Sequence, residues 1–215
     1  MDGRWLGRDV VSEIYHINIT HNILNTYVFL DNIPMNKYDV KGGYCDVCGP
    51  DVTEWLISTM HKNFKQFKKE VLDNILLAAV TPIEFYKRVR TGGAWDSKNS
   101  ISFESSECKT KSPTCKKGVT LCGQCTLIEN IGNIHYGWIG RAIGFPRNIL
   151  TAVAAAYQNG GVDESHDAAA IIIGMDMFDQ NGNLCDYIKQ NIESLKAGDS
   201  DRDLSKCTPC LHQYR

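Results

Sequence analysis

Apolar residues recur every three or four positions along most of the chain, which is the period of an amphipathic helix. The clearest run begins at Asp51, which forms a capping box with Glu54, and continues to about Ala79. A short helix is predicted from Thr81 to Arg90, because Thr-Pro-x-Glu is typical of a helix start and a Gly-Gly pair follows its end. Residues 51–90 are therefore predicted to be largely helical.

The second half has the same helical period and many small residues. Further helices are predicted over 146–158, 168–178 and 184–196. The one over 168–178 is apolar nearly all round, so it should be central in the core. Gly137, Gly140 and Gly144 recur on one helical face, where they would let another backbone approach closely. The predicted fold is a compact, mainly α domain, with α+β as the alternative.

The chain divides into three predicted parts, residues 1–44, 45–198 and 199–215. In the first part, residues 10–19 and 26–30 alternate in part and are rich in β-branched residues, so we expect a short β hairpin or an extension left from an upstream domain. The segment 99–126 is polar and rich in lysine and cysteine, and is too long for an unsupported loop. We expect it to be irregular and held by a metal or by disulfides. The last part should be loose unless its cysteines are tethered.

The composition limits the possible functions. The 215 residues are 43% hydrophobic and carry a formal net charge of −2, which suits one globular domain with a real core. A chain without a basic excess has no overall field for nucleic acid, and this disfavours a nuclease. The start of the chain lacks the pattern of a signal peptide, and no apolar run is long enough for a transmembrane helix. Export would therefore depend on a secretion system or on a fused upstream domain.

Nine cysteines are many for a chain of this length, and six of them form three C-x-x-C pairs. Two thiolates at this spacing can reach one ion, so two pairs can complete a tetrahedral zinc site. The best set for a structural zinc is Cys45, Cys48, Cys122 and Cys125, and a weaker set is Cys108, Cys115, Cys207 and Cys210. The alternative is a disulfide framework, as expected in a periplasm or outside cells. Because nine is odd, Cys185 is predicted to be a free buried thiol.

Two motifs in the middle of the chain carry a resemblance. The first is Gly92, Gly93, Trp95, Asp96 and Lys98, and the second is Gly132, Asn133, Tyr136 and Gly137, followed by Gly144, Phe145 and Pro146. In order and spacing they resemble the type 44 domain of bacterial polymorphic toxins, and the similarity covers about residues 45–195. The resemblance implies an exported antibacterial toxin with a cognate immunity protein as its partner.

Candidate catalytic residues lie mainly in these motifs, and no organic cofactor is expected. They are Glu84, Asp96, Lys98, Asn133, His135, Tyr136 and Asp167. Asp96 follows a tight turn, where aromatic packing can hold it and Lys98 can tune its charge. The alternative is that Asp96 and Lys98 form a surface pair, and Trp95 anchors the turn. His135 is read as a structural histidine rather than a base.

Three classes of function fit these residues. Paired carboxylates with neutral hydrogen-bonding groups favour a hydrolase of cell-wall glycan, peptidoglycan, acting in the periplasm of the target cell. A metal-independent ribonuclease acting in the cytoplasm is the second class, with His135 or Asp96 as its base. A non-enzymatic cysteine-rich binding module is the third. Disulfides would point to the periplasm, and zinc with reduced cysteines would point to the cytoplasm.

Overall fold

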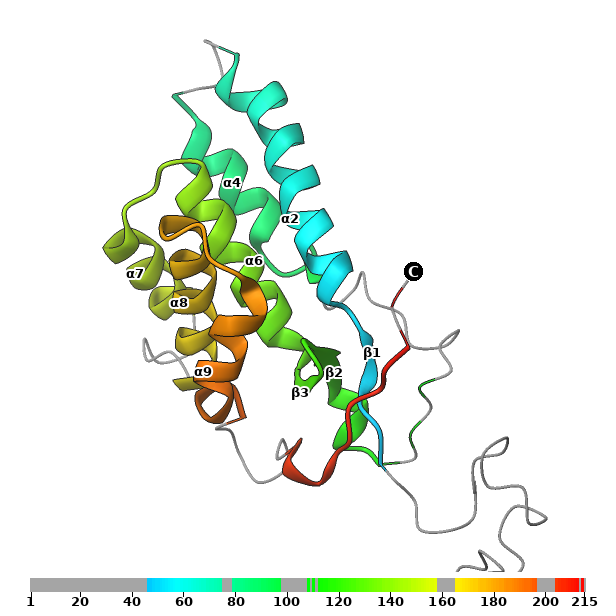
Figure 1. The fold of residues 1–215 in the computed structure, drawn as a ribbon. Coiled ribbons are helices and arrows are strands. Elements are labelled where there is room, and N and C mark those ends of the chain that lie inside the picture. The colour runs from blue at the N-terminus through cyan, green and yellow to red at the C-terminus, as the bar shows by residue number, and fades with distance from the viewer. Residues whose placement is uncertain are drawn as a thin grey trace, which may run out of the picture. The chain divides into compact units, whose positions relative to one another are not determined.

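Helices dominate the computed structural model, and a small sheet lies at one end of them (Figure 1). The structure describes residues 46–74, 79–97, 112–157, 165–196 and 204–212, together with residues 108, 110 and 214. Within these residues the predicted mainly α fold with some β structure is confirmed. The strands predicted over 10–19 and 26–30 lie outside them. In the described part, no helix has both the length and the apolar character needed to cross a membrane.

In the first half, the residues that the structure describes form two α-helices, α2 (Thr53–Phe67) and α4 (Thr81–Val89). The Oδ1 atom of Asp51 accepts hydrogen bonds from the backbone N (2.9 Å) and the hydroxyl (2.6 Å) of Thr53. The N-cap position is Val52 and has no side-chain cap hydrogen bond, so the predicted capping box of Asp51 with Glu54 is not formed. A π-helical turn, η2 (Lys68–Leu72), continues the chain from α2. The helical run ends at Leu72, and Ala79, to which it was predicted to continue, lies in a turn. Residues 75–78 lie outside the described part. The prediction for the short helix is confirmed in α4.

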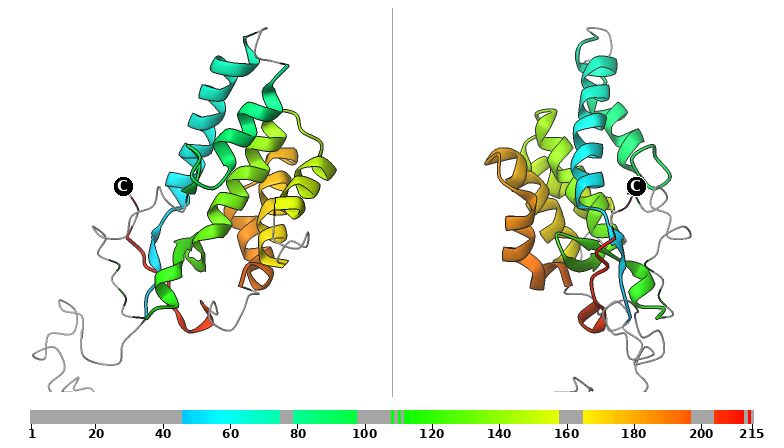
Figure 2. Two further views of the ribbon diagram at one scale, coloured as in Figure 1. Left: turned by 180° about the vertical axis from the view of Figure 1, so that it is seen from behind. Right: turned by 45° about the vertical axis from the view of Figure 1, so that its right-hand side comes forward.

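The described residues of the second half form four α-helices, α6 (Ile128–Ala142), α7 (Arg147–Tyr157), α8 (Ser165–Asp179) and α9 (Leu184–Lys196). The bounds of α7, α8 and α9 agree closely with the ranges predicted for them, whereas no range was predicted for α6. Helix α8 packs against α6 on one side and α9 on another, so its predicted central place is confirmed (Figures 1 and 2). The largest fully buried side chains come from these helices, α2 and the sheet and include Phe67, Leu56, Met60, Ile131, Ile134, Ile173, Met175 and Ile188. Burial of this apolar surface is the main stabilising contribution.

Glycines let α6 and α8 approach to backbone contact. A Cβ atom added at Gly137 would collide with the carbonyl oxygen of Ile171, and one added at Gly174 would collide with that of Ile134. The predicted packing role of the small residues is therefore present at Gly137. Gly144 differs, since it has a φ of +98° just beyond α6 and no neighbour within 4 Å of an added Cβ. It ends the helix in the left-handed conformation that favours glycine.

The sheet consists of β1 (Gly49–Asp51), β2 (Gly118–Leu121) and β3 (Gln124–Leu127), in that order. Strand β1 pairs parallel to β2, and β2 pairs antiparallel to β3. The prediction that residues 99–126 are irregular is wrong for β2 and β3. The two-residue turn between them has positive φ at both Cys122 (52°) and Gly123 (72°), as the common hairpin turn requires. This Cys-Gly pair between two β-branched segments is a signal that the sequence analysis missed.

Eight cysteines form four disulfides, which corrects the zinc prediction. The pairs are Cys48–Cys125, Cys108–Cys210, Cys115–Cys207 and Cys122–Cys185. The predicted zinc set is wrong because Cys48 and Cys125 bond to each other, while Cys122 bonds to Cys185. All four cysteines of the weaker set also form disulfides. Cys45 lies outside the described residues. Cys185 is not a free thiol, since it lies within bonding distance of Cys122 at the hairpin turn.

The C-terminal segment is tied to the sheet. A 3-10 turn, η5 (Leu204–Lys206), leads into it, and Cys207 and Cys210 hold it through their disulfides. Backbone hydrogen bonds join Cys48 N to Thr208 O (2.9 Å) and Asp51 N to His212 O (2.7 Å). Figure 1 shows this segment running beside β1. The sequence analysis expected the tail to be loose unless its cysteines were tethered. They are tethered, so the tail is held.

Candidate functional site

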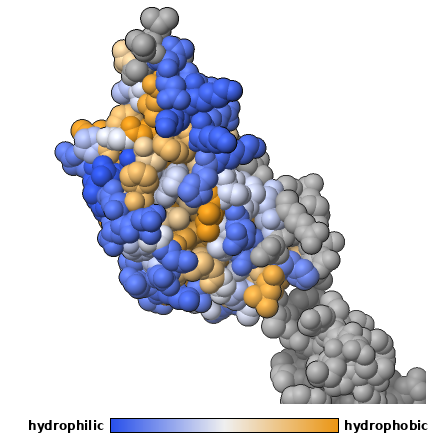
Figure 3. All heavy atoms as spheres, turned by 45° about the horizontal axis from the view of Figure 1, so that its top comes forward, coloured by the Kyte–Doolittle hydropathy of each residue, from blue (hydrophilic) through white to orange (hydrophobic). Residues whose placement is uncertain are grey.

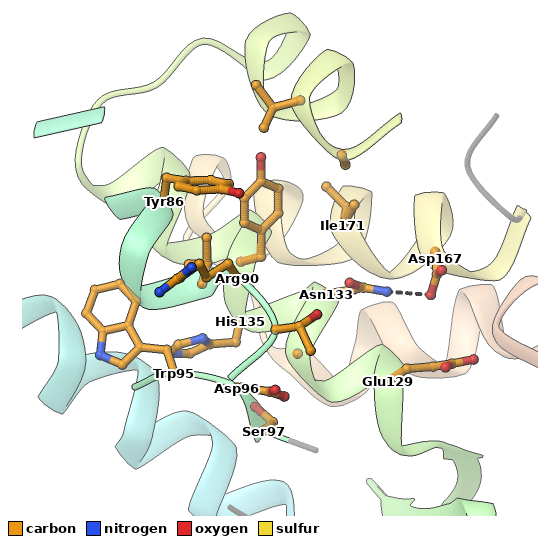
Figure 4. A pocket seen from close by; sticks show the side chains of 16 residues that line it. Tyr86, Arg90, Trp95, Asp96, Ser97, Glu129, Asn133, His135, Asp167 and Ile171 are labelled. Carbon is orange, nitrogen blue, oxygen red and sulfur yellow. Dashed lines mark hydrogen bonds between the residues drawn. The ribbon is translucent and has the colours of Figure 1, made fainter. Parts of the chain in front are cut away.

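A pocket of about 390 Å³ lies between α4, the loop after it, α6, α7 and α8 (Figure 4). Asp96 from the loop, Asn133, His135 and Tyr136 from α6, and Asp167 from α8 all line it. Five of the seven candidate catalytic residues are thus brought together from segments up to 71 residues apart in the chain. These residues therefore share one pocket.

Two candidates are not placed in this pocket. Glu84 lies on α4 outside the pocket lining, and its Oε1 accepts a hydrogen bond from Lys87 Nζ at 2.7 Å. This is an ordinary pair of neighbouring helical side chains with a small contribution to stability. Lys98 lies outside the described residues, so the expected pairing of Asp96 and Lys98 is left as a prediction.

Asp96 combines a place in the pocket with a structural bond. Its Oδ2 atom accepts a hydrogen bond from the backbone N of Gly92 at 2.9 Å, and its own N donates to Gly93 O at 3.1 Å. Gly92 has a φ of +74°, and a Cβ at Gly93 would collide with the backbone of Arg88. The Gly-Gly turn therefore exists because both residues lack side chains. It presents the carboxyl group of Asp96 to the pocket.

Aromatic packing anchors the loop that carries Asp96. Trp95 is 7% exposed and lies 5.7 Å from Phe67 and 5.6 Å from His135, measured between ring centroids. The guanidinium carbon of Arg88 lies 5.4 Å from the centroid of the Trp95 ring. Cation–π and aromatic contacts of this kind favour one orientation of the ring. The geometry therefore fits the predicted anchoring role of Trp95.

The motif residues of α6 have different environments. The hydroxyl of Tyr136 donates a hydrogen bond to the carbonyl of Leu150 (3.0 Å), and its ring stacks on Phe85 at 5.5 Å. These contacts join α6 to α7 and α4. The side-chain amide of Asn133 instead donates to Oδ1 of Asp167 on α8, as the dashed line in Figure 4 shows. Asn133 therefore orients the carboxylate of Asp167 in the pocket, whereas Tyr136 holds together the helices that form the pocket wall.

His135 is buried, with 2% of its surface exposed, and its Nε2 lies 3.1 Å from Nδ2 of Asn63. An amide nitrogen only donates, so Nε2 must accept and the proton must be on Nδ1. Burial lowers the pKa of His135 to about 4, so the ring is neutral at physiological pH. Such a ring is a weak base, which fits the structural interpretation.

This burial makes stability depend on pH. The unfolded chain protonates His135 near pH 6.5, and the folded chain does so only near pH 4. The contribution of the neutral, buried ring to the free energy of unfolding is therefore complete above pH 6.5 and is lost as the pH falls from 6.5 to 4. The loss is about 3 kcal/mol at most. Urea unfolding from pH 7 to pH 4 should show a weaker pH dependence in His135→Gln, whose carbonyl can still accept from Asn63. Parallel pH dependences in the two proteins would contradict this account.

A cluster of three polar side chains at the pocket was not predicted from the sequence. Glu129 on α6 and Asp167 on α8 line the pocket, and Nε2 of His166 lies 3.0 Å from Oε1 of Glu129 and 3.5 Å from Oδ1 of Asp167. The imidazole of His166 is 1% exposed. Among the described residues these three form a group able to hold a metal ion. Two sequence features could have indicated this cluster. Glu129 and Asn133 lie one helical turn apart, and a His-Asp pair stands at the start of the next long apolar helix.

Comparison with known families gives the context for this pocket. Residues 84–180 match the bacterial toxin 44 family. The resemblance predicted from the motifs is thereby confirmed. No curated protein and no solved structure matches the chain.

All residues that line the pocket, from Tyr86 to Ile171, lie inside the toxin 44 match. Each of the four disulfides joins one cysteine inside the match to one outside it. The outside cysteines lie before β1, in α9 and in the C-terminal segment, at Cys48, Cys185, Cys207 and Cys210. The toxin 44 segment therefore supplies the pocket, and disulfides attach the flanking segments to it.

Proposed function

We propose that this protein is an antibacterial toxin that hydrolyses cell-wall glycan, peptidoglycan, outside the cytoplasm. The observation that carries the proposal is the convergence of the carboxyl groups of Asp96, Glu129 and Asp167 on one pocket. Glycoside hydrolysis needs one acid to protonate the leaving oxygen and a second group to activate water or stabilise the developing cation. Three carboxylates from three separate segments can divide these roles.

The other lining residues support a glycan over a nucleic acid. Tyr86 is 40% exposed and Val153 is 44% exposed, so apolar surface lies at the edge of the pocket, where a sugar ring can pack. Figure 3 shows apolar residues gathered in a band on one face, with hydrophilic residues on both sides. Of the described lining residues Arg90 is the only cation, which is a weak attraction for a phosphate backbone. The low pKa of His135 also makes it a poor base for attack by a ribose hydroxyl.

The cysteine chemistry supports the compartment. Disulfides persist in oxidising surroundings such as a periplasm, and are reduced in most cytosols. Peptidoglycan lies in that oxidising compartment and RNA does not. We propose that a secretion system or a fused upstream domain delivers the protein to the target cell periplasm. The producing cell would carry an immunity protein that blocks the pocket.

In the proposed division of roles, Asp96 protonates the glycosidic oxygen, and the group formed by Glu129, Asp167 and His166 activates the attacking water. Asp96 suits the first role because the turn presents it directly to the pocket. The Glu129 and Asp167 side chains suit the second, because an imidazole and an amide already hold both in place.

The proposal is tested by incubating purified, disulfide-bonded protein with isolated peptidoglycan sacculi and, separately, with total RNA. We expect new reducing sugar ends from the sacculi, soluble muropeptides on chromatography, and intact RNA. Asp96→Asn is the matched inactive control. Degraded RNA with unchanged sacculi would favour the ribonuclease, and no product from either substrate would favour a binding module.

A further inference from the structure

We propose that Glu129, His166 and Asp167 bind one divalent transition-metal ion at the pocket. The inference goes beyond the proposed function, because binding of the ion does not depend on the substrate. The three side chains come from α6 and from the start of α8, and two of them line the pocket. A bound ion would therefore be reached from the same space as Asp96.

The spacings from His166 to the two carboxylates are close to those of ligands around one ion. Nε2 of His166 lies 3.0 Å from the Glu129 oxygen and 3.5 Å from the Asp167 oxygen, and all three donor atoms lie within 4.8 Å of one another. Ligands about 2.1 Å from a metal are about 3.0 to 3.4 Å apart in octahedral or tetrahedral geometry. At 3.5 Å the contact with Asp167 is too long for a good hydrogen bond, but suits two ligands of one ion.

The kinds of donor indicate the class of ion. One imidazole nitrogen and two carboxylate oxygens suit Zn²⁺ or Mn²⁺, whereas Ca²⁺ and Mg²⁺ prefer oxygen donors alone. Two negative side chains, 19% and 13% exposed, also favour a positive ion between them. Three protein ligands leave a coordination position open to the pocket, as in catalytic rather than structural zinc sites.

The surroundings hold these donors in place. His166 is 1% exposed, so its ring is fixed by packing, and the amide of Asn133 donates a hydrogen bond to Oδ1 of Asp167. Hydrogen bonds of this kind orient the ligands of metal sites. A bound Zn²⁺ would lower the pKa of a water on its open position to about 7, which is the chemistry that such an ion supplies.

Calorimetric titration of chelator-treated, disulfide-bonded protein with ZnCl₂ tests the inference. We expect one ion per chain, tight binding of Zn²⁺ or Mn²⁺, and much weaker binding of Mg²⁺ and Ca²⁺. Glu129→Gln and Asp167→Asn keep the shape of each side chain and should each weaken Zn²⁺ binding more than tenfold, since loss even of an outer-shell partner costs roughly 10–100-fold. Asp96→Asn, in the same pocket but outside the group, should bind Zn²⁺ as the wild type does.

Circular dichroism and thermal melts should show that each variant is folded before it is titrated. The inference is overturned if the wild type binds no Zn²⁺, if folded Glu129→Gln and Asp167→Asn bind it unchanged, or if Mg²⁺ binds as tightly as Zn²⁺. None of these outcomes bears on the glycan assay, which is read from the sacculi. A metal-free protein that still releases reducing ends would show that the proposed function does not require the ion.

Discussion

Wild-type protein directed to the periplasm of a bacterial cell is expected to kill it, and Asp96→Asn directed there is expected not to. The amide oxygen of Asn can still accept the hydrogen bond from Gly92, so the turn should be retained. The amide can neither donate the proton of a carboxylic acid nor carry its charge. Loss of a general acid costs typically 10²–10⁴-fold in rate, enough to turn killing into survival.

The measurement is viable count after induction, for each protein in the periplasm and in the cytoplasm. Cytoplasmic wild type should kill weakly, because its disulfides do not form there and the peptidoglycan is out of reach. A thermal melt of purified Asp96→Asn serves as the control for folding. Killing confined to the cytoplasm with degraded RNA would contradict the glycan proposal. Undiminished killing by Asp96→Asn would transfer the acid role to Glu129 or Asp167.

Reduction of the disulfides is expected to unfold the protein. The four bonds close loops of 63 to 102 residues, and in the chain-entropy account each such bond stabilises the fold by about 4–5 kcal/mol. Their sum exceeds the roughly 5–15 kcal/mol of a typical domain. Thermal melts with and without a reducing agent should therefore differ by tens of degrees, or the reduced protein should show no cooperative transition.

A double variant, Cys122→Ala with Cys185→Ala, separates one bond from the rest. It removes the bond between the hairpin turn and α9 and should lower the free energy of unfolding by about 2–5 kcal/mol while the other three bonds remain. The wild type, denatured but not reduced, should react with a thiol reagent at no more than one cysteine. Identical melts of the oxidised and reduced forms, or several reactive thiols, would contradict the disulfide framework.

The sequence predicted what depends on neighbouring residues. Helix α4 was found because Thr-Pro-x-Glu and Gly-Gly mark its two ends, and α9 because its apolar period is unbroken. The loop with Asp96 and the motif with Asn133 were both singled out for candidate catalytic residues, and both line the pocket. The hairpin of β2 and β3 was missed because Cys122 was read as a metal ligand or a disulfide partner and not as a turn residue.

Features that depend on distant residues could not be predicted in the same way. A C-x-x-C pair has the same spacing whether it binds zinc or its two cysteines pair elsewhere, and partners 63 to 102 residues away decide between these outcomes. The contact of His166 with Glu129 depends on the packing of α8 on α6. Neither relation leaves a periodic signal, because it arises only when separate helices dock.

The backbone contact of α6 with α8 has a consequence for motion in the pocket. With Gly137 against Ile171 and Gly174 against Ile134, neither helix can slide along the other without a carbonyl oxygen meeting a backbone atom. One rigid pair of helices, α6 and α8, therefore carries Glu129, Asn133 and Asp167. Any narrowing of the pocket around a substrate must come from α4 with its following loop, or from α7. Asp96 would then be the acid that moves. It would move toward Glu129 and Asp167, whose positions are fixed by the packing of α6 on α8.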